Sequence, residues 1–322
     1  MRDNSAMHLL IPYAAPTGPR CQAAISQLHL PHLGALLQRF KRTRQHLGQA
    51  NDLTPLYERL AITLAGHTMQ DGLTAQAAMA AHKIGLQTHS DTSQGWAYIT
   101  PCHWQIHADH VHMTDPANLR LSTEESSALM QSMLGYFSED GITLHPYTQS
   151  TWLAQGDVFC DLPSASLERV VGGSVDAWIQ RQPQAKPLRR LQNEMQMLLY
   201  THPINDARTE RGLPVVNSFW VSGTGTPKES TQPAQPLVCV PSLKDSAQID
   251  DASGWLAAWH MLDSQLRDTL AGTPEDTIHI TLCSDKQAHT YAYQTQPWYK
   301  RIQHRINPTP ANSHLQALLP QL

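Results

Sequence analysis

Residues 188–225 constrain the fold of this chain more than any other stretch. Apolar side chains recur there at three- and four-residue steps, which places them on one face of a helix. This face holds Leu188, Leu191, Met195, Leu198 and Leu199. A polar loop is expected next, followed by a buried strand over Val215–Val221 and a glycine turn at 222–225. Polar groups held between a rigid helix and a rigid strand are typical of a binding site, although an ion-paired surface loop fits the same pattern.

The polar loop carries the side chains that we expect to bind a ligand. The planar guanidinium of arginine forms paired hydrogen bonds with carboxylate or phosphate. We therefore predict that Arg208 and Arg211 hold a phosphorylated or carboxylate small molecule. The further polar contacts expected in this ligand site are His202, Asn205 and Asn217.

Composition limits the class of protein. The 322 residues fit one large domain or two, and the apolar fraction of 41% supplies a core. A net charge of −4 favours neither a nucleic-acid nor an acidic-membrane partner. No apolar run approaches the roughly 20 residues of a membrane helix. Five widely spaced cysteines without a CxxC motif favour reduced thiols, so we predict a cytoplasmic protein.

Two short basic clusters stand out against this background. The first contains Arg39, Lys41, Arg42 and Arg44, and the second contains Lys300, Arg301 and Arg305. The first follows an apolar helical pattern over residues 33–40, where basic residues suit the end of a helix. Each cluster is therefore expected to be a solvated helix face rather than a phosphate-binding groove.

Residues 101–116 form the densest polar segment. Imidazole and carboxylate groups at such spacing would suit zinc or manganese. The candidate ligands are His103, His107, Asp109, His110 and His112, with Asp285 as a distant assistant. The favoured interpretation is a strand edge or loop whose histidines form local hydrogen bonds, with no metal. Cys102 beside His103 is a weak nucleophile candidate, because adjacent residues rarely orient as a catalytic dyad and a lone cysteine usually packs.

Predicted strands and helices interleave along the chain, which indicates an α/β protein with some antiparallel pairs. Strands are expected at residues 7–13, 95–100 and 277–283, and a hairpin within 141–153. The sequence Ser-Thr-Glu-Glu at 122–125 is a capping box that begins a helix. A long amphipathic helix is expected over 253–270.

The segments LQNEMQMLLYTHPINDAR and VNSFWVSGTG resemble a proteobacterial family of regulatory proteins of the RpfE type. More distantly, they resemble the archaeal type of cofactor-independent phosphoglycerate mutase. The matching positions are His202, Pro203, Asn205, Arg208, Gly212, Asn217, Gly223 and Gly225. The resemblance implies an alkaline-phosphatase-like fold over residues 1–322, with a central, mostly parallel sheet flanked by helices. It also implies a smaller inserted α+β subdomain at approximately residues 120–225.

The mutases use two metal ions and a nucleophilic serine, and three matching positions differ here. After the opening strand, where they carry a metal-binding Asp-Gly, residues 12–14 read Pro-Tyr-Ala. In the segment that matches their nucleophile motif, residues 108–113, the serine position is Ala108. After the late strand, where they carry Gly-Asp-His, residues 284–286 read Ser-Asp-Lys, and Lys286 beside Asp285 would replace the charge of a metal.

These changes predict a mutase-like protein without phosphomutase chemistry and without a resident cofactor. We expect a regulatory protein, in effect a pseudoenzyme, that binds an anionic metabolite. The alternative is a metal-dependent phosphotransfer or hydrolytic enzyme whose zinc or manganese ion binds the cluster at 103–112. The sequence does not identify a protein partner.

Overall fold

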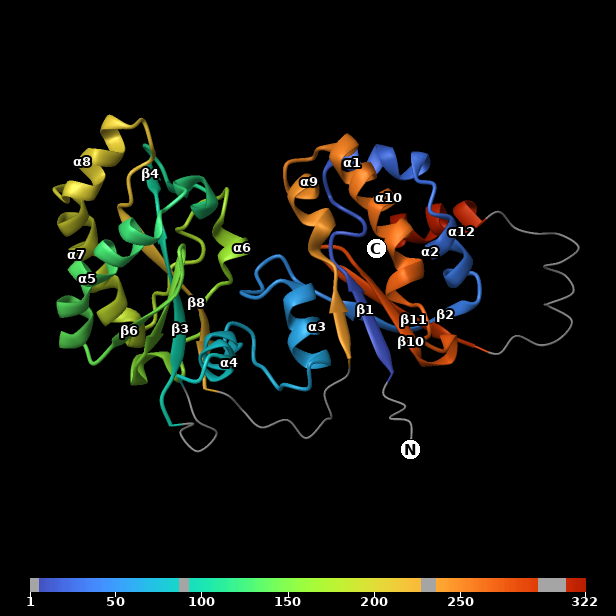
Figure 1. Ribbon diagram of the computed structural model, residues 1–322, viewed down its shortest axis with the longest axis horizontal. Helices are drawn as coiled ribbons and strands as arrows, with labels where there is room; N and C mark the ends of the chain where they lie inside the picture. The colour runs from blue at the N-terminus through green and yellow to red at the C-terminus, as the bar shows by residue number, and fades with distance from the viewer. Residues whose placement is uncertain (1–5, 87–92, 227–235, 295–310) are drawn as a thin grey trace, which may run out of the picture. The chain divides into compact units, whose positions relative to one another are not determined.

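The computed structural model describes residues 6–86, 93–226, 236–294 and 311–322, and its chain forms two compact units (Figure 1). The first unit combines the described residues up to 51, residues 56–67 and those from 236 onward. The second contains residues 52–55 and 68–226. In sequence, the second unit is therefore inserted into the first, and it begins well before residue 120, where we expected an inserted subdomain to start.

The first unit is built on a five-stranded sheet with the order β2-β11-β10-β1-β9. Its strands are β1 (Met7–Ile11), β2 (Phe40–Leu47), β9 (Leu237–Cys239), β10 (Ile278–Cys283) and β11 (Gln287–Tyr293). β1 runs parallel to both β9 and β10, whereas β10–β11 and β11–β2 are antiparallel. The sheet is therefore mixed rather than mostly parallel, because the hairpin partner β11 and the edge strand β2 both pair antiparallel.

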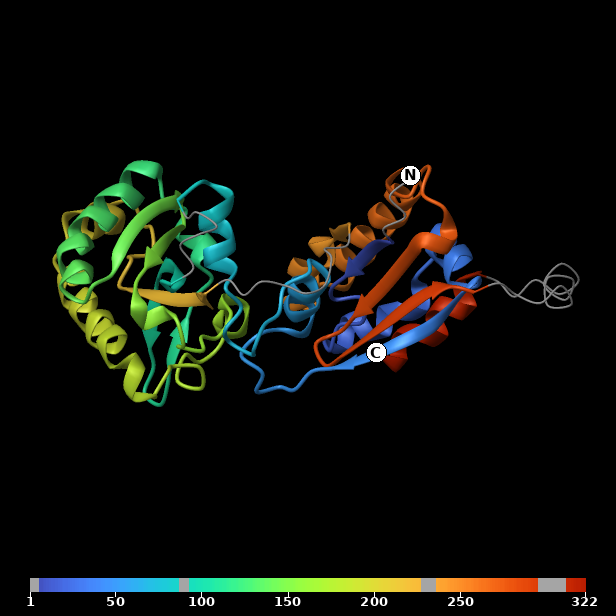
Figure 2. The ribbon, with the colours of Figure 1, turned by 90° about the horizontal axis from the view of Figure 1, so that it is seen from below.

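Helices cover the two faces of this sheet unequally (Figures 1 and 2). Side chains alternate between faces along a strand, so Leu9 and Ile11 enter the larger core. That face packs against α1 (Pro19–Ala24), α2 (Pro31–Leu37), α10 (Ala252–Thr269) and α12 (Ala311–Leu318). The opposite face packs against α3 (Leu56–Leu64), with Leu10 in a smaller core. A short helix, α9 (Lys244–Gln248), precedes α10.

The second unit contains a fully antiparallel sheet with the order β6-β7-β3-β8. Its strands are β3 (Trp96–Cys102), β6 (Thr143–Thr148), β7 (Thr151–Gln155) and β8 (Ser218–Gly225). The predicted strand at 95–100 and the predicted hairpin within 141–153 are both present. The chain as a whole is mixed α/β.

Helices flank this second sheet. α5 (Thr123–Glu139) and α7 (Lys186–Tyr200) pack against the sheet in one hydrophobic core. α4 (Gln76–Lys83) packs against β3 and β8 in a second, smaller hydrophobic cluster. The predicted capping box at Ser122 begins α5. The predicted apolar face of residues 188–199 is buried in α7 at Leu188, Leu191, Met195 and Leu199.

The segment that we expected to be a polar loop is a helix, α8 (Pro203–Glu210). Its start follows from local chemistry, because His202 accepts a hydrogen bond from the Ile204 N–H and proline suits the first turn. The expected glycine turn belongs to β8 itself. Gly223 adopts φ +66°, and a Cβ there would lie 2.6 Å from the Tyr98 ring. A side chain would therefore clash at this point of the strand.

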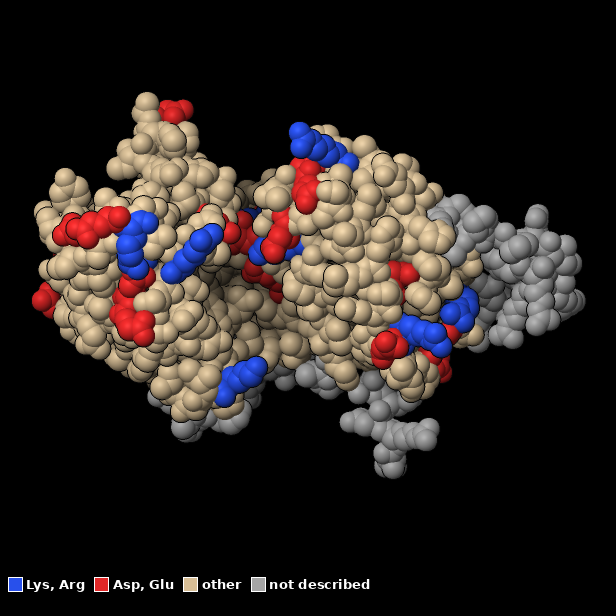
Figure 3. Space-filling model, turned by 45° about the horizontal axis from the view of Figure 1, so that its top comes forward, with Lys and Arg blue, Asp and Glu red and all other residues tan. Residues whose placement is uncertain are grey.

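The first basic cluster is also placed differently from our expectation. Lys41, Arg42 and Arg44 lie in β2, an edge strand, and not on a helix. The second cluster, at 300–305, lies outside the described residues. On the face shown in Figure 3, lysine and arginine side chains lie singly or beside acidic ones, without one large basic patch. Within the described ranges, no helix combines the length and apolar character needed to cross a bilayer.

Candidate functional site

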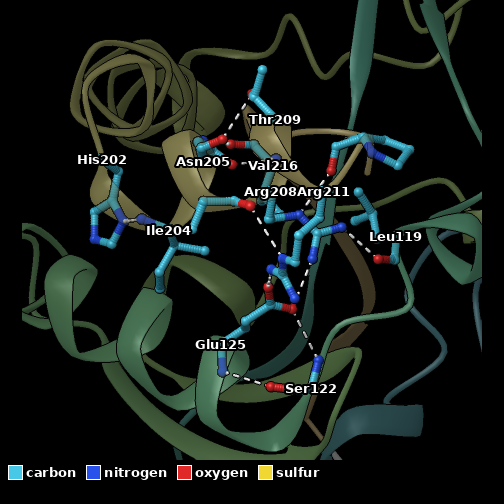
Figure 4. A network of polar contacts seen from close by, with 12 residues as sticks. Leu119, Ser122, Glu125, His202, Ile204, Asn205, Arg208, Thr209, Arg211 and Val216 are labelled. Carbon is cyan, nitrogen blue, oxygen red and sulfur yellow. Dashed lines mark hydrogen bonds and ion pairs between the residues drawn. The ribbon is translucent and has the colours of Figure 1, made fainter.

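The predicted ligand residues around α8 form a network of internal polar contacts (Figure 4). Arg208 is fully buried, with none of its side chain exposed. Its Nε donates to the Pro214 carbonyl at 2.8 Å, and its Nη2 donates to the Leu119 carbonyl. Its Nη1 forms an ion pair of 2.7 Å with Glu125 Oε2. All three guanidinium nitrogens thus bond to other groups of the protein, and the side chain has no surface exposed to solvent.

Glu125 connects this network to the start of α5. It completes the capping box, because its carboxylate accepts from the Ser122 N–H at 3.1 Å while its own N–H donates to Ser122 Oγ. Burial opposes ionisation of Glu125, but the Ser122 hydrogen bond and the charges of Arg211 and Arg208 outweigh burial. The pKa of Glu125 therefore lies below its ordinary value. Sequence reasoning recognised the capping box but missed the arginines as partners of Glu125.

The two asparagines act as connectors between backbone segments. Asn205 is buried, and its amide donates to the Leu199 and Val216 carbonyls at 2.7 Å each while accepting from the Val216 N–H. Asn217 exchanges two hydrogen bonds with the backbone of Trp104, at 2.7 and 2.8 Å. Both side-chain amides therefore bond to backbone groups of the protein.

His202 and Arg211 also form contacts within the protein. His202 caps α8 through Nδ1, and its Nε2 lies 2.8 Å from Ser132 Oγ. Burial lowers the pKa of His202, and the charge of Asp206 offsets part of this effect. Arg211 is half exposed and pairs with the second oxygen of Glu125. In this structure these polar groups connect α5, α7, α8 and the segment that precedes β8 to one another. Ligand binding by the same residues stays a prediction.

The histidine-rich segment forms a small hairpin of β4 (Trp104–Ile106) and β5 (Val111–Met113). At its tip the rings of His107 and His110 stack at 4.7 Å, and His110 Nδ1 lies 2.6 Å from Asp109 Oδ1. The His112 ring meets His107 edge-on at 6.2 Å. His103 Nδ1 contacts the Val215 carbonyl instead.

His103 and His110 thus form local hydrogen bonds, and the other two histidines of the segment are held by ring contacts. Across the described part of the chain, no three His, Cys, Asp or Glu side chains are arranged to hold a metal. Asp109 belongs to the second unit and Asp285 to the first. Cys102 is fully buried, and burial raises the pKa of its thiol far above the ordinary value, so it is not an activated nucleophile.

A pocket lies where the loops that follow β1 and β10 come together. β1 and β10 are parallel neighbours, so their carboxyl ends lie at the same edge of the first sheet. Clefts at this edge are the usual ligand sites of open α/β sheets. The pocket measures about 280 Å³, and we call it the carboxyl-edge pocket. Its lining includes Ala15, Thr17, Gln22, Ser284, Lys286 and Leu322.

The loop 284–286, which follows β10, contributes Ser284 and Lys286 to this pocket. Lys286 is exposed and lines the pocket, whereas Asp285 accepts a hydrogen bond of 3.2 Å from Thr17 Oγ1. Ser284 Oγ donates to the Leu322 carbonyl at 2.8 Å. No ion pair joins Lys286 to Asp285 among the described residues, so the internal salt bridge that we expected is not formed. Sequence reasoning found Lys286 but not Thr17 or Gln22, which lack a sequence signal.

Comparisons with known proteins find remote structural neighbours. No protein-family model matches the chain, and no curated protein matches it. The PH0037 protein of Pyrococcus horikoshii superposes with a TM-score of 0.47 at 12% identity, covering 90% of this chain and 87% of that one. The cofactor-independent phosphoglycerate mutase of Thermoplasma acidophilum superposes with a TM-score of 0.36 at 12% identity, covering 90% and 89%. Both identities and both scores are low, so this remote similarity decides neither the fold family nor the function of the chain.

Proposed function

We propose that this protein binds a small phosphorylated or carboxylate metabolite at the carboxyl-edge pocket and does not transform it. One observation carries the proposal: among the described residues that line the pocket, Lys286 alone has a charged side chain. An ammonium group in a concave site attracts anions as a point charge. The side-chain amide of Gln22, which can donate hydrogen bonds, lines the pocket with it.

The same lining does not suit the two-metal chemistry of phosphoglycerate mutases. It offers no side-chain carboxylate, imidazole or thiolate, which are the groups that hold divalent metals. The sequence differences at residues 12–14 and at Ala108 agree with the loss of that chemistry. A regulatory role, as in proteins of the RpfE type, is consistent with binding without turnover and rests on the sequence resemblance. The metal-dependent alternative at residues 103–112 is not favoured by the hairpin geometry.

Titration calorimetry of the full chain with phosphoglycerate tests the proposal. We expect the wild-type protein to bind and Lys286→Ala to weaken binding by at least about tenfold, because the one cation of the pocket is lost. The matched control is Lys83→Ala, which removes an exposed lysine at the end of α4. It should leave the affinity within about twofold.

Two results would contradict the proposal. Equal affinities of wild type and Lys286→Ala would place the ligand elsewhere. Release of an isomerised or dephosphorylated product during the titration, followed by phosphorus NMR, would show that the protein is an enzyme.

A further inference from the structure

The face of the first sheet that carries α3 is only partly apolar. Leu10, Cys283 and Ala288 pack against Leu56 and Leu60 of the helix. Elsewhere on the same face the strands carry polar side chains in place of the usual Val, Ile or Leu. These are His8 in β1, His279 and Thr281 in β10, and Thr290 in β11.

These polar residues line a second pocket, of about 230 Å³, beside the end of α3. We call it the histidine pocket and define it by His8, Arg44, His46, His279, Thr281 and Thr290. All six belong to the first unit. The volume is below the roughly 300 Å³ at which pockets for drug-sized molecules begin, so a ligand here must be small.

The buried polar groups of the pocket are ordered by hydrogen bonds. His8 Nε2 lies 2.7 Å from Thr281 Oγ1, which lies 2.8 Å from Thr290 Oγ1. The rings of His8 and His279 meet edge-on at 5.6 Å. A hydroxyl has one proton and two lone pairs, so a chain that begins with a proton on His8 Nε2 points the Thr290 proton away from Thr281. When His8 Nε2 carries the proton, the Thr290 hydroxyl is therefore a donor that a ligand can use.

The charge of the pocket is positive. Arg44 is exposed, lines the pocket and forms no ion pair with any described residue. No aspartate or glutamate contributes to the described lining. Burial, followed by the nearby charge of Arg44, lowers the pKa of both His46 and His279. The guanidinium therefore acts on side chains of two strands, β2 and β10, that are separated by β11 in the sheet.

Free carbonyl groups at the end of a helix carry partial negative charge, which would weaken the positive charge of this pocket. At the end of α3 these carbonyls are bonded. The Ala65, Gly66 and His67 N–H groups bond to the carbonyls of Ala61, Thr63 and Ile62. Gly66 closes the helix with φ +86°, as glycine commonly does. The partial negative charge of the last turn is thus largely taken up by the backbone.

We propose that the histidine pocket binds a small oxyanion, phosphate or carboxylate, held by Arg44 and by the hydroxyl of Thr290. It is separate from the carboxyl-edge pocket and does not depend on it. A cation is disfavoured because Arg44 repels it, whereas a guanidinium pairs well with the oxygens of phosphate or carboxylate.

Binding at this pocket is coupled to protonation of its histidines. The facing titratable or charged groups are His8 from β1, Arg44 and His46 from β2, and His279 from β10; the described lining residues of β11 and α3 add none. A bound anion favours the charged imidazoles and so raises the pKa of His46 and His279. By linkage, an anion whose own charge is constant over this range, such as a carboxylate, binds more tightly as the pH falls from about 7.5 to about 5.5.

Titration of Lys286→Ala protein with inorganic phosphate isolates the histidine pocket from the carboxyl-edge pocket. We expect phosphate to bind, and Arg44→Gln added to this background to weaken binding by at least about tenfold. The matched control is Arg42→Gln in the same background. Arg42 is an exposed arginine of the same strand. In the strand register it lies beside Tyr291, whose side chain is on the opposite face of the sheet from the histidine pocket. Its loss should therefore change the affinity by less than about twofold.

The histidine rings supply a readout that a general charge effect would not move. We expect phosphate to raise the pKa of His46 and His279 in NMR titrations, with signals assigned through His46→Gln and His279→Gln, and to do so in Arg42→Gln but not in Arg44→Gln. Equal losses of affinity in the two arginine variants, or ring pKa values unchanged by phosphate, would overturn the proposal. If Arg44→Gln does not fold, Arg44→Lys keeps the charge without the planar fork and should still weaken binding.

Discussion

Arg208 shows how a side chain of functional appearance is used structurally. Its guanidinium lies in the interior, where an unpaired charge costs several kcal/mol, and it is balanced by Glu125 and two backbone carbonyls. Arg211 pairs with the same carboxylate but is half exposed, so water screens its interaction. Arg208 and Arg211, three positions apart, thus contribute differently to the free energy of unfolding.

Replacing Arg208 with Met should therefore lower the free energy of unfolding by about 3–5 kcal/mol, because Glu125 loses its buried partner and two carbonyls lose their donor. Arg211→Met, the same change at an exposed position, should cost less than about 1 kcal/mol. Urea denaturation followed by circular dichroism measures both values. A similar small loss in both variants would show that Arg208 is not a structural clamp.

At the scale of elements, β8 depends on a residue without a side chain. Gly223 combines a positive φ with the close approach of the Tyr98 ring. Gly135, inside α5 and four residues before its end, has no neighbouring atom within 4 Å of an added Cβ. The two glycines thus predict opposite responses to the same substitution.

Gly135→Ala should raise the free energy of unfolding by about 0.5–1 kcal/mol, because alanine favours a helix over glycine. Gly223→Ala should lower it by roughly 2 kcal/mol or more, because it adds both backbone strain and a clash. Thermal melts of the two variants, recorded beside wild type, give the sign of each change. Stabilisation by Gly223→Ala would contradict the geometry of β8.

For the whole molecule, the histidines set how stability responds to acid. Burial, as the largest cause, lowers the pKa of His46, His145, His202, His279 and His289 below the ordinary value of 6.5. The unfolded chain therefore binds more protons than the native one as the pH falls below that value. The stabilisation is present above pH 6.5 and is lost as the pH falls through the lower native pKa values.

We expect the urea midpoint in phosphate-free buffer to fall steadily from about pH 7 to about pH 5. His289→Gln should reduce this slope, because it removes one buried imidazole, whereas replacing the exposed His260 with Gln should leave the slope unchanged. A midpoint that stays constant or rises over this range would show that the buried histidines do not control acid stability.

Local patterns were sufficient to predict several elements. The repeat of Leu188, Leu191, Met195 and Leu199 predicted α7, and the Ser122 capping box predicted the start of α5, because both signals depend on neighbours within a few residues. The same local reasoning predicted a polar loop where the structure has α8, and a helix face where it has β2. Pro203 and the basic run after Phe40 fit more than one local structure, and contacts with the rest of each unit decided between them.

What the sequence alone determined is which chemical groups the protein possesses, among them Arg208 and Arg211, the histidines of residues 103–112, and Lys286. Only the tertiary structure decided which of these groups are free to act. Arg208 is occupied by Glu125, a residue 83 positions away, and His8 and Thr281 meet across 273 positions. Such pairings arise from strand order and helix packing, which no short pattern encodes, so the candidate sites moved from α8 to the two pockets of the first unit.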